Sequence, residues 1–185
     1  MIKMKDILLE IGDGSSKSFP WQYHEEHHQF DNQDFVYTFE TQQGTYAATF
    51  TLSGDNDWDL AFGMMGEVYG TNFGAVTGVG AFRVMATIIE IIKDFLQYTY
   101  KAHVEDKELY TLGSTVPNKI SFNTTKEPGR SEEEDSRRSN LYKAYIQKQV
   151  PGARVEKQLS GAHGDAYTIT LPQKLGTFAN NNVND

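Results

Sequence analysis

The sequence predicts an α/β fold with a mixed sheet, and three features of the 185-residue chain lead to this prediction. Runs that alternate apolar and polar residues, as strands do, occur both before and after the middle of the chain. Between them the segment "MATIIEIIKDFLQYT" repeats its apolar residues at helical spacing. A second helical segment follows a further strand, so helices are expected to connect strands that lie in one sheet.

The first part of the chain is predicted to be a short helix followed by an antiparallel meander. Residues 2–11 have the pattern of a short amphipathic helix, and the segment "FPWQYHEEHHQFDNQ" is predicted to be a loop or an edge segment. Three strand candidates with short turns between them come next, which predicts antiparallel pairing. These candidates are Phe35–Thr41, Thr45–Leu52 and Trp58–Met65.

The second part of the chain alternates helices with strands. The long helix is predicted at Ala81 to Tyr100 and a short strand at Asn118–Thr124. A second helix is expected to begin near Ser136, a residue type that caps helices, and to end at "VPG". A terminal hairpin is expected around "GAHGD". The predicted order is therefore a short α followed by β-β-β-α-β-α-β-β.

Composition limits the classes of function. One domain is predicted over 1–172, with a flexible Asn-rich tail at 173–185. The chain has no cysteine, which excludes disulfides, thiolate catalysis and zinc–thiolate sites. A net charge of −8 argues against general nucleic-acid binding. Neither a membrane span nor a secretory leader is visible, so a location inside a cell is expected.

Glycines stand directly ahead of the long helix. Gly78 and Gly80 allow the backbone to turn with positive φ and to approach a ligand closely. The helix start after them would expose unpaired N–H groups and the positive end of the helix dipole, which together attract phosphate. A flexible loop that precedes the helix without any ligand explains the same glycines. The residues alone leave both interpretations open.

The element order and the position of these glycines resemble the GNAT acetyltransferases. The family's turn motif is Arg/Gln-x-x-Gly-x-Gly/Ala, and "AVTGVG" matches it at the glycines but has Ala75 at the Arg/Gln position. The resemblance implies that acetyl-CoA is the cofactor and that it lies across two splayed strands. It also implies that the backbone of five residues binds the pyrophosphate, namely Val76, Gly78, Val79, Gly80 and Ala81.

The resemblance also implies catalytic residues. The family's second helix carries a tyrosine that protonates the departing CoA thiolate, and "SNLYKAYIQK" places Tyr142 there. A core-packing role explains Tyr142 equally well. Glu67, just past the third strand, is the candidate base for the attacking amine, and Asp57, Asp59 and Glu90 are weaker candidates. A solvated carboxylate is the alternative for each of the four acids.

The segment "HEEHH" has histidines at positions 24, 27 and 28. On a helix this spacing would cluster three imidazoles, which could bind a metal ion. No helical pattern surrounds the segment, so no metal site is predicted.

Two functions from different classes follow. The first is transfer of an acetyl group from acetyl-CoA to an unknown amine on a small molecule or a protein. The second follows from a resemblance of both helical segments to small uncharacterised tailed-phage proteins. It is a non-catalytic phage protein with a GNAT-like fold that acts in the virion or binds a host protein in the host cytoplasm. Ala75 and the short region ahead of the meander favour the second function.

Overall fold

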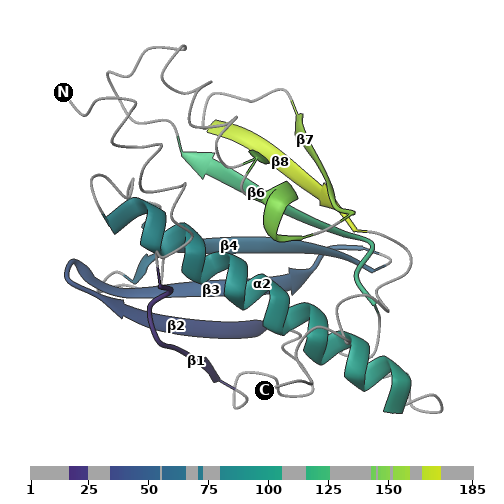
Figure 1. The fold of residues 1–185 in the computed structure, drawn as a ribbon, viewed down its shortest axis with the longest axis horizontal. Coiled ribbons are helices and arrows are strands. Elements are labelled where there is room, and N and C mark those ends of the chain that lie inside the picture. The colour runs from purple at the N-terminus through teal and green to yellow at the C-terminus, as the bar shows by residue number, and fades with distance from the viewer. Residues whose placement is uncertain are drawn as a thin grey trace.

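A computed structural model describes the fold of this chain over ten ranges of residues. These residues are 17–24, 34–54, 56–65, 71–72, 80–105, 116–125, 143–144, 146–150, 152–158 and 164–171. They contain eight strands and one long helix (Figure 1). The elements are β1 (Trp21–His24), β2 (Phe35–Thr41), β3 (Gly44–Leu52), β4 (Asp57–Met65), β5 (Thr71–Asn72), α2 (Gly80–Glu105), β6 (Lys119–Thr125), β7 (Arg154–Gln158) and β8 (Gly164–Thr170).

The strands form one mixed sheet. Seven of them lie side by side in the order β1-β2-β3-β4-β6-β8-β7, and β5 pairs with the end of β4. Every neighbouring pair is antiparallel except β4 and β6, which are parallel. Two parallel neighbours need a crossover connection, and α2 lies between them in the sequence. The predicted α/β class with a mixed sheet is therefore confirmed.

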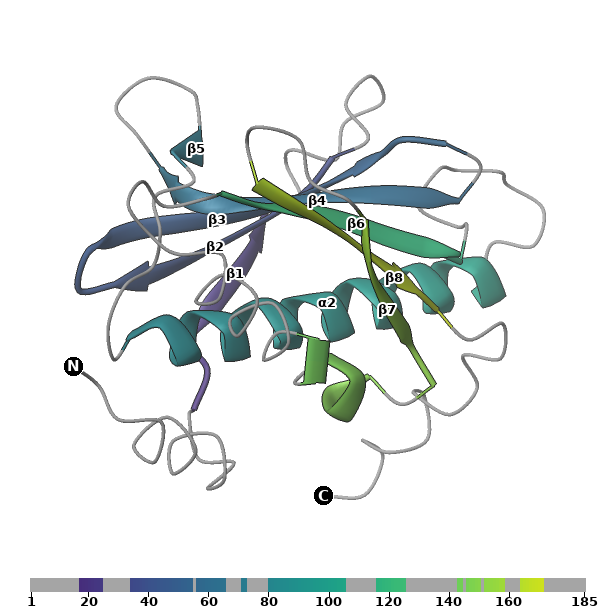
Figure 2. The same cartoon turned by 90° about the horizontal axis from the view of Figure 1, so that it is seen from above.

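Helix α2 lies along one face of the sheet (Figure 2). We call this face the inner face and the opposite one the outer face. On β2 the alternate residues Phe35, Tyr37 and Phe39 are buried, as expected for a strand with one face against a helix. The apolar stripe predicted for α2 is the side that is buried. The predicted residues that are buried are Met85, Ile88, Ile89, Ile92, Phe95, Leu96 and Thr99, and Val84, Ala86, Thr87 and Ile91 of α2 are buried as well.

The centre of the core is an aromatic cluster around Phe95, which is fully buried. The Phe95 ring stacks on the Phe50 ring at a centroid distance of 4.0 Å. The rings of Phe35 and Trp58 contact Phe95 edge-on, each at 5.1 Å. The core thus joins α2 to β2, β3 and β4.

Three differences from the predicted elements concern boundaries and short strands. The segment predicted to be a loop or an edge segment contains β1, which is the edge strand beside β2. Helix α2 begins at Gly80 and continues to Glu105, five residues past the predicted end. Strand β5 was not predicted, because two residues are too few to show a period-2 pattern.

The last part of the chain contains helical residues ahead of two strands. Residues 143–144 and 146–149 are helical and fall within the predicted second helix. Ile146 and Val150 are buried in the core, and β7 and β8 form the predicted terminal hairpin. Residues 2–11, 136–142 and 173–185 lie outside the described residues, so the first helix, the start of the second and the tail stay predictions. No helix in the described part of the chain is both long and apolar enough to span a membrane.

Candidate functional site

The parallel ladder between β4 and β6 ends before either strand does. It pairs Asp57–Leu60 of β4 with Lys119–Phe122 of β6 and goes no further. Strand β4 continues to Met65 and β6 continues to Thr125. Figure 1 shows the two strands moving apart beyond the last pair. The two strands therefore splay beyond Leu60 and Phe122.

The pairing of Met64 shows which edge of β4 faces this splayed interval. Met64 pairs with Tyr46 of β3 and also with Asn72 of β5, so β3 and β5 lie on opposite edges of β4. Strands β5 and β6 thus pair with the same edge of β4. Strand β6 pairs with the start of β4 and β5 pairs with its end. We call the interval between them the β4–β6 opening, bounded by Ala61–Gly63 of β4 and Asn123–Thr125 of β6.

The two faces of the opening differ in chemistry. On the inner face the Phe62 and Phe122 rings lie 6.4 Å apart, and Phe122 stacks on Tyr167 at 5.2 Å. On the outer face β4 has only the small residues Ala61 and Gly63. Backbone N–H and C=O groups on a strand edge form hydrogen bonds with an extended polar ligand as they do with a strand.

The start of α2 lies at the end of the molecule where β4 and β6 separate (Figure 1). Its first turn is Gly80, Ala81, Phe82 and Arg83, and it contains no acidic residue. The first N–H groups of a helix have no partner within the helix, and they lie at the positive end of its dipole. Together with the cationic Arg83, this turn has the electrostatic character that an anionic group needs.

Most residues predicted for the site lie outside the described residues. These are Glu67, Tyr142, Val76, Gly78 and Val79. Two others, Gly80 and Ala81, are the first two residues of α2. The proposed acid, the proposed base and most of the glycine turn therefore stay predictions.

The described residues include the three weaker base candidates, Asp57, Asp59 and Glu90. Asp57 and Asp59 are on the paired part of β4, before the ladder ends, and their side chains point to the outer face. Asp57 forms an ion pair of 3.5 Å with Lys119. Glu90 forms an exposed ion pair of 2.9 Å with Lys93 on α2. Asp57 and Glu90 thus each pair with a lysine, and Asp59 lies two residues before Ala61 on the same face of β4.

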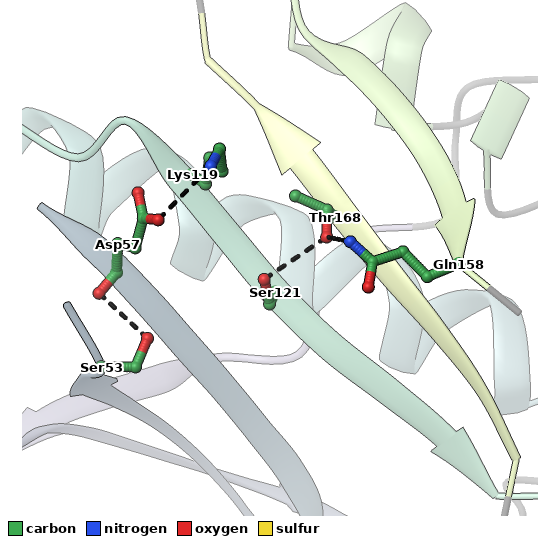
Figure 3. A network of polar contacts seen from close by, with 6 residues as sticks. All are labelled: Ser53, Asp57, Lys119, Ser121, Gln158 and Thr168. Atoms are coloured by element: carbon green, nitrogen blue, oxygen red, sulfur yellow. Dashed lines mark hydrogen bonds and ion pairs between the residues drawn. The ribbon is translucent and has the colours of Figure 1, made fainter. Parts of the chain in front are cut away.

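Sequence reasoning missed a group of polar contacts on the outer face (Figure 3). Ser121 and Thr168 lie opposite each other on β6 and β8 with their hydroxyl oxygens 3.5 Å apart. The Gln158 amide donates to the Thr168 hydroxyl at 3.2 Å. The alternation of polar and apolar residues along β6 and β8 is the sequence pattern that could have indicated these contacts. These side-chain contacts join β6, β8 and β7 and stabilise the pairing of these strands.

A buried pair, Tyr37 and Asp94, is also absent from the sequence predictions. The Tyr37 hydroxyl donates to Asp94 Oδ2 at 3.1 Å. Burial raises the pKa of Asp94, while the hydrogen bond from Tyr37 partly opposes this. Burial, and next the adjacent carboxylate, raise the pKa of Tyr37 far above its ordinary value, so the phenol stays protonated. Asp94 is several helical turns beyond Gly80, so the pair is remote from the start of α2.

Of the segment "HEEHH", only His24 lies within the described residues. His24 is on strand β1, where its Nε2 atom lies 2.7 Å from the Thr38 hydroxyl oxygen. The helical spacing that would cluster three imidazoles therefore does not apply at His24. Residues 27 and 28 lie outside the described residues. Within the described ranges no three histidine or acidic side chains group together as metal ligands would.

Comparison of the chain with protein-family models, with curated proteins and with solved structures found no match. The interpretation of the site therefore depends on its own geometry and chemistry.

Proposed function

We propose that this protein is a GNAT-like acyltransferase that transfers an acetyl group from acetyl-CoA to an amine. The observation that carries the proposal is the β4–β6 opening, where a parallel ladder ends at Leu60 and Phe122 although both strands continue. The start of α2 at the same end of the sheet supports it. The extended pantetheine arm would lie along β4, and the pyrophosphate would bind the backbone of residues 76–81.

The proposed reaction is direct transfer without an acyl-enzyme. The amine nitrogen attacks the thioester carbonyl, a C–N bond forms, and the C–S bond breaks. Glu67 accepts the proton that the amine loses, directly or through water, and Tyr142 donates a proton to the CoA thiolate. The family resemblance assigns the role of Tyr142. Glu67 is proposed from its place just past β4. The absence of cysteine from the chain agrees with direct transfer.

Acetyl-CoA is expected to bind and to stabilise the folded protein. A ligand that binds only the folded state at one hundred times its dissociation constant adds about 2.7 kcal/mol to the free energy of unfolding. Calorimetric titration and thermal melts with millimolar acetyl-CoA measure this. Absence of both heat and a thermal shift would refute the proposal.

Gly80→Pro is expected to weaken acetyl-CoA binding by about tenfold, because it removes one N–H donor from the start of α2. Proline is tolerated at the first position of a helix, so the fold should persist. Gly80→Ala keeps the N–H group and is the matched control. Equal affinities of the two variants, measured by calorimetry, would show that this N–H group does not contact the ligand.

The second candidate is a non-catalytic protein with the same fold that acts in a virion or binds a host protein. Ala75, which stands where the family has Arg or Gln, favours it because a polar side chain for the phosphates is missing. The acetyl-CoA titration separates the two candidates. Copurification with virions or with one host protein, together with no acetyl-CoA binding, would support the second.

A further inference from the structure

Residues 17–20, directly ahead of β1, contact the start of α2 although more than sixty residues separate them in the sequence. The Phe19 N–H donates to the Thr87 hydroxyl at 2.8 Å. Arg83 Nε donates to the Lys17 carbonyl at 2.9 Å. The Arg83 guanidinium also lies over the Phe19 ring, 4.0 Å from its centroid, which is a cation–π contact. Three separate interactions thus join this segment to the first two turns of α2.

Thr87 takes part in two of the hydrogen bonds at this contact. Its side chain is fully buried, accepts from the Phe19 N–H and donates to the Arg83 carbonyl at 2.8 Å. Thr99, also fully buried in α2, donates to the carbonyls of Phe95 and Leu96, within its own helix. Both threonines therefore bond back to the helix, as buried helical threonines commonly do. Only Thr87 is seen to bond a second segment of the chain as well.

A stack of aromatic rings continues the contact across the sheet. The Phe19 ring stacks on Phe39 of β2 at 6.0 Å, and Phe39 stacks on Tyr46 of β3 at 5.4 Å. Tyr46 lies directly opposite Met64 in the ladder between β3 and β4. With Arg83 above Phe19, the stack runs from the first turn of α2 to Tyr46 on β3, the strand that pairs with the end of β4. This end of β4 adjoins the β4–β6 opening.

We infer that Lys17–Pro20 form a strap that holds the start of α2 in place relative to the end of β4, with Thr87 and Arg83 as the positioning residues that fasten it. The functional part of the inference rests on the proposed function. In acyl transfer, α2 would contact the pyrophosphate of acetyl-CoA while β4 contacts its pantetheine arm. The strap fixes both elements before the ligand arrives, so less ordering free energy is lost on binding.

Thr87→Val tests the strap because it replaces the hydroxyl with a methyl group of similar size. The Phe19 N–H then loses its acceptor. Amide hydrogen exchange followed by mass spectrometry is expected to become about tenfold faster at residues 18–19 and 80–87 through local opening. Thr99→Val is the matched control, because it makes the same change in the same helix without touching the strap. It is expected to leave exchange at residues 18–19 unchanged.

Arg83→Met is a second test that does not disturb the core, because Arg83 is exposed. Methionine keeps the apolar stem and the helix propensity but removes the Nε donor and the charge. Exchange at residues 18–19 is expected to rise as in Thr87→Val. If neither variant exchanges faster there than Thr99→Val, the strap is refuted.

Acetyl-CoA binding tests the positioning role separately. Thr87→Val is expected to bind acetyl-CoA about tenfold more weakly than the unaltered protein, and Thr99→Val to stay within about twofold. If the unaltered protein binds and Thr87→Val binds equally well, the positioning role is refuted. If the unaltered protein binds no acetyl-CoA, the proposed function and the positioning role fail together, while hydrogen exchange still decides the strap.

Discussion

Phe95→Ala is expected to lower the free energy of unfolding by about 3–5 kcal/mol, as truncation of a buried Phe typically does. Phe95 is fully buried, and its ring contacts Phe35, Phe50 and Trp58. The loss combines the apolar area of the ring with the cavity left between α2 and three strands. Since a domain is stable by only about 5–15 kcal/mol, much of the total would disappear. Urea unfolding followed by circular dichroism measures the change.

Gln97→Ala is the control for this substitution. Gln97 is exposed on the same helix two residues later, so its replacement is expected to change stability by no more than about 0.5 kcal/mol. If Phe95→Ala cost no more than Gln97→Ala, Phe95 would not be the centre of the core.

Asp94→Asn is expected to raise the melting temperature at neutral pH but not in acid. Burial raises the pKa of Asp94 in the folded protein above its ordinary value of 3.8. The folded state then binds more protons than the unfolded state between these two pKa values, so stability falls as the pH rises through this window. Asparagine keeps an acceptor for the Tyr37 hydroxyl but carries no charge, so the variant avoids this loss.

Thermal melts of Asp94→Asn and the unaltered protein over a series of pH values from about 3 to about 7 measure the effect. The difference in melting temperature is expected to grow with pH. Parallel curves would show that Asp94 ionises as easily in the folded as in the unfolded protein.

Tyr37→Phe probes the other half of the pair. The Tyr37 hydroxyl donates to the Asp94 carboxylate, and a buried charge that loses its donor costs about 1–3 kcal/mol. The expected cost is larger at neutral pH than in acid, because the donor stabilises the ionised carboxylate. In an Asp94→Asn background the same substitution is expected to cost less. An equal cost in both backgrounds would indicate that the two side chains are not coupled.

Much of the fold was predictable because its elements have strong local patterns. The alternation in Phe35–Thr41 and the helical spacing around Phe95 reflect one face buried against the core. Strand β1 was left between loop and edge segment because four residues next to a polar stretch carry little pattern. The end of α2 was placed too early because "KAHVE" has neither a strong apolar stripe nor a breaker.

The candidate site was predictable only in part. The glycine pattern in the sequence includes Gly80, the first residue of α2. No sequence pattern near Leu60 or Phe122 indicates that the pairing of β4 with β6 ends there. Where two strands separate depends on how both are paired and twisted along the whole sheet. The sequence does not distinguish Asp57 and Asp59 from other acids, whereas the pairing of β4 places them opposite Lys119 and Ser121 of β6.

By itself the sequence determined the α/β class, the amphipathic faces and the lack of any cysteine chemistry, because side-chain periodicity and composition are local properties. Only the tertiary structure decided which strands neighbour one another, where β4 and β6 part, and that Phe19 and Tyr37 contact α2. Those contacts join residues that are tens of positions apart. These contacts form only when the sheet and the helix pack together, because the sequence around one residue of a contact does not indicate which residue it will contact.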